Sequence, residues 1–263
     1  MSAPLWQAVA EPIRTLGGLV HLAVDTVHET LDHVMRGRAP FRASLFFTQA
    51  DRAGIGSVPL VAMISFFMGL TMALLTGYQL RKFGTQNMVP GLVGIGFSRE
   101  LGPLMTGIMV AARIGAAYTA ELGTMTASEE VEAIDAMGIG PLRFLVAPRV
   151  LAVFLLLPCL SVIANIAALA GGAMVCQRQF DISFQYFIQL VLENLVVRDI
   201  VAGEIKSFIF GLVIGLISCY KGLAVTGGAA GVGVATTSSV VTSITVVIAT
   251  DTLFNIAMVL IYE

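Results

Sequence analysis

The sequence is poor in charge, and this scarcity excludes an ordinary soluble fold. Of its 263 residues 12% are charged, against roughly 25% in an average soluble domain, while 57% are hydrophobic and the mean hydropathy is +0.88. A soluble chain of this size would lack the polar surface to cover its core, so the excess apolar residues are expected to face lipid. The net charge of -2 gives no reason to expect nucleic acid as a partner.

Histidine, cysteine and the phosphate-binding loop of ATPases are also scarce or missing. His21, His28 and His33 all precede the first predicted span, so a Ser-His-Asp or histidine–metal site inside the membrane is excluded. The three cysteines are widely spaced in apolar runs and are expected to be packing residues. The glycine cluster 227–233 follows no strand and precedes no Lys-Ser/Thr pair. We therefore expect no enzymatic activity and no cofactor, with ATP bound by a partner subunit.

Long apolar runs, by contrast, recur along the chain and predict about five transmembrane helices. They cover about residues 53–80, 88–112, 150–176, 200–220 and 238–261. Residues 3–36 predict an amphipathic helix that lies in the membrane interface, because its apolar stripe is too narrow and too interrupted to span. The expected fold is therefore all-α, a polytopic membrane protein that forms a single permease domain over residues 1–263.

The basic residues outside the spans predict the orientation. The side that holds the N-terminus collects Arg14, Arg36, Arg38, Arg42, Arg52, Arg113, Arg143, Arg149 and Lys221, and the other side collects Arg81, Lys82, Arg178 and Arg198. This bias predicts a cytoplasmic N-terminus, and five spans then place the C-terminus outside. Arg113 is expected at the cytoplasmic end of the second span, where its side chain can reach water.

A short acidic segment lies in the predicted cytoplasmic loop between the second and third spans. Thr126 followed by Glu129 has the spacing of a capping box, and Gly138 and Pro141 are stop signals, which together predict a helix over 126–138. Its acidic residues are Glu129, Glu130, Glu132 and Asp135, and its apolar edge consists of Val131, Ile134 and Met137. The helix could be a solvated connector or a docking helix for a cytoplasmic partner.

Charged residues also interrupt the spans themselves. Arg99 and Glu100 fall near the centre of the second span and Asp251 near the middle of the fifth. Each charge costs about 2.5–3.5 kcal/mol there. Neighbours on a helix point about 100° apart, so Arg99 and Glu100 are expected not to satisfy each other. They could form interhelix ion pairs with Lys206, Glu204 or Asp251, or line a substrate cavity in which arginine binds lipid phosphate. Asp251 could likewise be a buried hydrogen-bonded residue or a cavity residue.

Three motifs, in order, carry a resemblance to a known family. Glu132-Ala-Ile, with Gly138 and Pro148-Arg149 after it, resembles the coupling-helix loop of ABC permeases. The other segments are Phe97-Ser-Arg-Glu-Leu-Gly-Pro103, continuing through Ala112-Arg-Ile-Gly-Ala to Ala120-Glu-Leu-Gly-Thr-Met125, and the glycine cluster followed by Ala235-Thr-Thr237. Residues 50–260 thus resemble the MlaE/YrbE family, the permeases of MCE-type ABC lipid transporters.

The resemblance implies a permease of an ATP-driven lipid transporter, with phospholipid as the expected substrate, in the bacterial inner (cytoplasmic) membrane. It implies a homodimer, two cytoplasmic ABC ATPase subunits, an MCE-domain protein on the outer side and membrane lipids that move through a cavity at the dimer interface. The candidate cavity residues are Arg99, Glu100 and Asp251, and the candidate ATPase-coupling residues are Glu129, Glu130, Glu132, Asp135 and Gly138. The alternatives are an ABC permease for a small solute and a membrane scaffold, although the few polar residues favour lipid over a polar solute.

Overall fold

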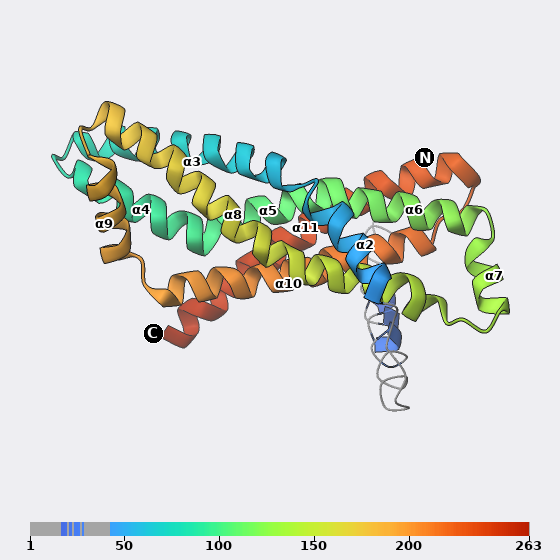
Figure 1. Cartoon of the computed structure of the whole chain (residues 1–263). Helices are drawn as coiled ribbons and strands as arrows, with labels where there is room; N and C mark the ends of the chain where they lie inside the picture. The colour runs from blue at the N-terminus through green and yellow to red at the C-terminus, as the bar shows by residue number, and fades with distance from the viewer. Residues whose placement is uncertain (1–16, 20, 23, 27, 29–42, 263) are drawn as a thin grey trace, which may run out of the picture. The chain divides into compact units, whose positions relative to one another are not determined.

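The computed structural model describes residues 17–19, 21–22, 24–26, 28 and 43–262, and this part of the chain contains helices but no strand (Figure 1). Five helices or helical runs are long and apolar enough to cross a membrane, which confirms the predicted all-α, multi-pass fold. They are α3 (Val58–Arg81), the run Gln86–Ala127, the run Leu142–Gln179, α10 (Val197–Leu223) and α11 (Gly228–Tyr262).

The second and third runs are composite. The second consists of η1 (Gln86–Met88), α4 (Val89–Gly96), η2 (Phe97–Leu101), α5 (Gly102–Val110), η3 (Ala111–Gly115) and α6 (Ala116–Ala127). The third consists of η4 (Leu142–Val146) and α8 (Ala147–Gln179). The shorter helices are α2 (Ala43–Gly54), α7 (Glu130–Ala136) and α9 (Phe184–Asn194). The described residues between 17 and 28 are helical, and the rest of the predicted interfacial helix lies outside the described residues.

Several helix ends differ from the ends of the apolar runs. The second run continues to Ala127, so Arg113 lies in η3 inside the run and not at its end, which corrects the prediction. Residues 113–127 contain no proline, and a helix need not stop where its hydropathy falls. Similarly, α11 begins at Gly228, because only Gly227 and Gly228 of the glycine cluster have positive φ and the residues after them are helical.

The segments η2, η3 and η4 are π-helical, and two of them end just before a proline. Gly102 donates its backbone N–H to the Phe97 carbonyl and Pro103 follows, while Ala147 donates to Leu142 and Pro148 follows. A proline has no N–H and clashes with the carbonyl four residues earlier, which disturbs the α-helical ladder in the preceding turn. The π turns change the rotation of the side chains that follow the expected α-helical positions.

The contacts of the chain group into two compact units. One consists of Met1–Gln49, Ala111–Val153 and Leu212–Ser243, and the other of Ala50–Val110, Phe154–Gly211 and Ile244–Glu263. The single permease domain expected from the sequence stays a prediction.

The second of these units is held together by close backbone contact and by an apolar core. A Cβ at Gly69 would collide with the Ala168 carbonyl, and one at Gly171 would collide with the Phe66 carbonyl, so α3 and α8 approach closely only because these residues are glycine. The core joins α3, α4, α8 and α9, and its buried members include Ala73, Val93, Phe97, Cys176, Phe187 and Val191. Figure 1 shows α9 beside α4 at one end of this unit.

The first unit has its own core around the acidic helix. Leu122, Leu145, Val146, Val150 and Cys219 are its buried members. A buried hydroxyl adds a polar link, because Thr119 Oγ1 lies 3.0 Å from the Ser218 carbonyl oxygen and 2.8 Å from Ser239 Oγ. This contact joins α6, α10 and α11, and it satisfies polar atoms that would otherwise be stranded in an apolar environment.

Candidate functional site

The predicted cavity residues Arg99 and Glu100 lie in η2, several turns from either end of the second run. Small residues bring η2 against α10. A Cβ at Gly203 would collide with the carbonyl oxygen of Ser98, so only glycine permits this separation of the two helices. The close approach places Glu100 within reach of a side chain from α10.

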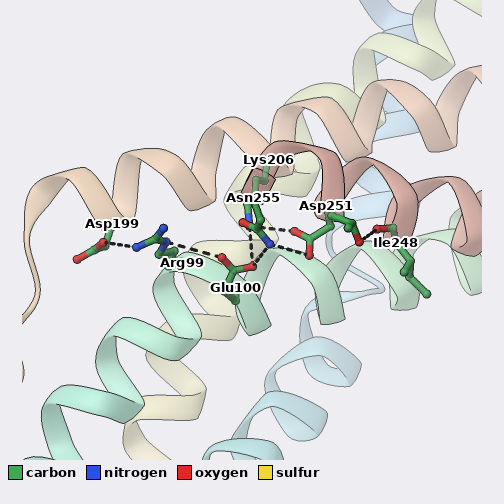
Figure 2. A network of polar contacts seen from close by, with 8 residues as sticks. Arg99, Glu100, Asp199, Lys206, Ile248, Asp251 and Asn255 are labelled. Carbon is green, nitrogen blue, oxygen red and sulfur yellow. Dashed lines mark hydrogen bonds and ion pairs between the residues drawn. The ribbon is translucent and has the colours of Figure 1, made fainter. Parts of the chain in front are cut away.

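That side chain is Lys206, which forms the centre of a polar network that also includes α11 (Figure 2). Lys206 Nζ lies 2.6 Å from Glu100 Oε2, 2.9 Å from Asp251 Oδ1 and 2.7 Å from Asn255 Oδ1. The Lys206 side chain is 1% exposed. Asn255 Nδ2 donates to Glu100 Oε2 at 3.1 Å and closes the network. A buried ammonium is tolerated because carboxylates and an amide oxygen replace its water.

Arg99 is held much more loosely than Lys206. Its Nε lies 3.7 Å from Glu100 Oε1, and its Nη1 lies 3.8 Å from Asp199 Oδ1 (Figure 2). Both distances exceed those of a hydrogen bond, and the Arg99 side chain is 38% exposed. The guanidinium therefore keeps donors for a further acceptor, whereas the ammonium of Lys206 is enclosed by its partners.

Two expectations about these charges were wrong. Arg99 and Glu100 do approach each other, because the π turn changes their angular spacing and the long arginine side chain can fold toward its neighbour. Glu204 takes no part in the network. It lies two residues before Lys206 and so faces another direction on α10, and its carboxylate oxygens have no hydrogen-bond partner within the described residues.

The structure brings Arg99, Glu100 and Asp251 together, and it adds two residues that the sequence reasoning missed. Asn255 lies four residues after Asp251, on the same face of α11, and Asp199 lies near the start of α10. A polar residue one turn from a charge inside an apolar helix was a signal that could have identified Asn255. The five charged residues comprise three carboxylates and two cations.

The acidic helix α7 is present but begins later than predicted. Thr126 does not cap it, because its hydroxyl donates to the Leu122 carbonyl at 2.9 Å and so continues α6. The capping-box prediction is therefore wrong. Glu129 occupies the position before α7 with φ of 60°, in the left-handed region that most residues avoid. Such a conformation in a residue other than glycine costs free energy and is often found at functional sites.

The end of α7 follows the predicted stop signal. Gly138, with φ of 72°, donates to the Asp135 carbonyl at 2.8 Å, and Ile139 donates to Ile134 at 3.2 Å, which together form a Schellman motif. The four acidic residues are exposed, namely Glu129, Glu130, Glu132 and Asp135. Val131 and Ile134 pack against the core of their unit, while Met137 is exposed. Thus α7 is fixed along one edge and presents its acids to the surroundings.

A multi-pass helical protein with a charged network inside its spans and an exposed acidic helix between two of them has the features of a membrane permease. The family model described as "Permease MlaE" matches residues 46–257. The chain therefore belongs to the MlaE permease family.

Its relatives are described in the same terms. A probable ABC transporter permease protein of Rickettsia prowazekii is 37% identical over 206 residues, which is 78% of this chain and 80% of the relative. A probable ABC transporter permease protein of Synechocystis is 32% identical over 81% of this chain and 80% of its own length. The chloroplastic protein TRIGALACTOSYLDIACYLGLYCEROL 1 of Arabidopsis thaliana is 34% identical over 91% of this chain and 65% of its own length.

Proposed function

We propose that the chain is the membrane subunit of an ATP-driven lipid transporter in the bacterial inner membrane. It works as a homodimer with two cytoplasmic ABC ATPase subunits, an MCE-domain protein on the outer side and phospholipid as its substrate. The membership of an ABC permease family and the exposed α7 favour a partner that supplies ATP hydrolysis. The lipid assignment has additional support from the Arabidopsis relative, whose name is that of a glycolipid.

The observation that carries the substrate proposal is the contrast between Arg99 and Lys206. The ammonium of Lys206 is fully engaged by Glu100, Asp251 and Asn255, whereas Arg99 is partly exposed and makes only long contacts. A guanidinium with unused donors can bind two oxygens of a phosphodiester at once. In this proposal Lys206 and its partners support the site, and Arg99 contacts the lipid headgroup.

The charge balance of the network favours a zwitterionic headgroup over an anionic one. Three carboxylates face two cations, so the five residues carry an excess of one negative charge when all are ionised. An anionic lipid would add to this excess. A headgroup with both phosphate and ammonium can contact Arg99 and a neighbouring carboxylate together, as phosphatidylethanolamine would.

The acids of α7 suit the second half of the proposal, which is docking to an ATPase. They are exposed on a helix whose opposite edge is packed against the unit's core, so a partner can bind them without unfolding the chain. A scaffold that recruits a non-ATPase partner would use the same surface.

Purification in mild detergent, followed by mass spectrometry of proteins and lipids, tests the assignment. We expect an ABC ATPase in equal amount to the permease and phospholipid that remains bound. Recovery of a stoichiometric partner without an ATPase fold, or of the chain alone, would contradict the proposed function and favour the scaffold.

A further inference from the structure

An ion pair joins the two helices that flank α7. Arg149 lies near the start of α8 and Glu121 lies in α6, on opposite sides of α7 in the chain. Arg149 Nη2 is 3.1 Å from Glu121 Oε2. The Arg149 side chain is 5% exposed and that of Glu121 is 41% exposed. A nearly buried guanidinium needs specific partners, because desolvation of the charge is unfavourable.

The guanidinium of Arg149 uses its planar shape to make contacts in several directions. Its Nη1 donates to the Leu145 carbonyl at 2.8 Å, and its central carbon lies 5.9 Å from the centroid of the Tyr118 ring. Glu121 and Tyr118 belong to α6, whereas Leu145 belongs to η4. Arg149 therefore ties the segment before α7 to the segment after it, and a lysine could not make these three contacts at once.

The apolar edge of α7 packs at the same place. Val131 and Ile134 contact a core whose buried members include Leu122 and Leu145. Leu122 follows Glu121 in the chain, and Leu145 accepts the hydrogen bond from Arg149. The ion pair and the α7 contacts thus belong to one packed body within this unit, and a displacement of α7 presses on residues that the ion pair holds together.

We propose that Arg149 and Glu121 are positioning residues that make α6 and α8 move together when a partner moves α7. The proposal rests on the proposed docking of an ATPase to α7. Without the pair, the apolar core still holds the chain together, but the two flanking helices can shift separately. Movement of α7 is then absorbed locally, and ATP hydrolysis drives less lipid transport.

The test compares Glu121→Gln and Arg149→Lys with two matched controls. Glu193→Gln changes an exposed glutamate on α9, and Arg178→Lys changes an exposed arginine at the other end of α8. Each protein is purified with its co-purifying ATPase and reconstituted in liposomes that contain fluorescent phosphatidylethanolamine. ATP hydrolysis, lipid transferred per ATP and melting temperature are measured on the same preparations.

We expect both pair variants to keep the bound ATPase and its hydrolysis rate while the lipid transferred per ATP falls by about two- to tenfold. The controls should match the wild type. An unchanged ratio in both pair variants overturns the positioning role, as does a proportional fall of hydrolysis and transport, which indicates structural damage. If Arg149→Lys folds poorly, the more exposed Glu121→Gln decides. A wild-type chain without ATP-dependent transfer would instead refute the proposed function.

Discussion

At the scale of single residues, Lys206 is the group on which the charged network depends. Its ammonium separates Glu100 from Asp251 and is almost wholly buried. Lys206→Met should leave two carboxylates facing each other without a cation, with a loss of about 3–5 kcal/mol in the free energy of unfolding. Thermal unfolding in detergent measures this loss as a lower melting temperature.

A matched variant separates charge from packing at Lys206. Lys206→Met combined with Glu100→Gln and Asp251→Asn removes the cation together with both of its acids. This triple variant should recover most of the lost stability, because neutral amides can hydrogen-bond to one another and to Asn255. A triple variant that is as unstable as Lys206→Met would show that the lysine stem, and not its charge, holds these helices.

Arg99 is expected to behave differently, because it is partly exposed and loosely held. Arg99→Ala should keep the melting temperature while phospholipid binding and transport fall by about tenfold, since a hydrogen bond to a charged group contributes roughly 1.5–3 kcal/mol. Arg99→Lys should recover part of the loss, because an ammonium cannot reproduce the forked contact. Quantified phospholipid in the purified protein is the readout. Normal lipid content and normal transport in Arg99→Ala would exclude headgroup binding by this residue.

The sequence was sufficient to identify charges that needed partners, but not to pair them. A charged residue inside a span is costly wherever it lies, so Arg99, Glu100 and Asp251 stood out from composition alone. Which faces meet depends on helix rotation and separation. The π turn at η2 rotates Glu100, and Gly203 determines how close α10 can approach. Neither effect follows from an α-helical periodicity, so the roles of Asn255 and Asp199 became visible only in the structure.

At the scale of elements, the same distinction separates the spans from their ends. The apolar runs predicted five spans because transfer into lipid depends on composition. The ends were less predictable, because helices such as α6 continue through polar residues once they are nucleated. At α7 the stop signal of Gly138 was read correctly, since a positive φ there favours glycine. Thr126 misled because a threonine hydroxyl can bond backward to its own helix instead of forward as a cap.

The exposed acids of α7 yield the prediction at this scale. Glu129→Lys combined with Glu130→Lys should abolish association with the ATPase and leave insertion and melting temperature unchanged. Both side chains are exposed, so charge reversal affects binding and not the core. Co-purification of the ATPase is measured, with Glu193→Lys on α9 as the control. Full ATP-dependent transport by the double variant would refute docking through this surface.

At the scale of the whole molecule, five spans and the distribution of arginine and lysine predict opposite locations for the two termini. Single cysteines introduced at positions 2 and 263 can be labelled with an impermeant reagent in intact and permeabilised cells. Cys159, which is exposed, is replaced by serine in the starting protein. Position 263 should label in intact cells, and position 2 only after permeabilisation. Labelling of both positions from one side would contradict the five-span topology.

The central claim is that this permease uses ATP hydrolysis by a partner to move phospholipid, and transport in a reconstituted system tests it most directly. The permease and its co-purifying ATPase are placed in liposomes, and the transfer of fluorescent phosphatidylethanolamine is followed with ATP, without ATP and with a non-hydrolysable analogue. Phosphatidylglycerol carrying the same fluorophore serves as the anionic comparison. We predict transfer that requires hydrolysis and favours phosphatidylethanolamine. Equal transfer with and without ATP, or ATP-dependent movement of a small polar solute in place of lipid, would contradict the account.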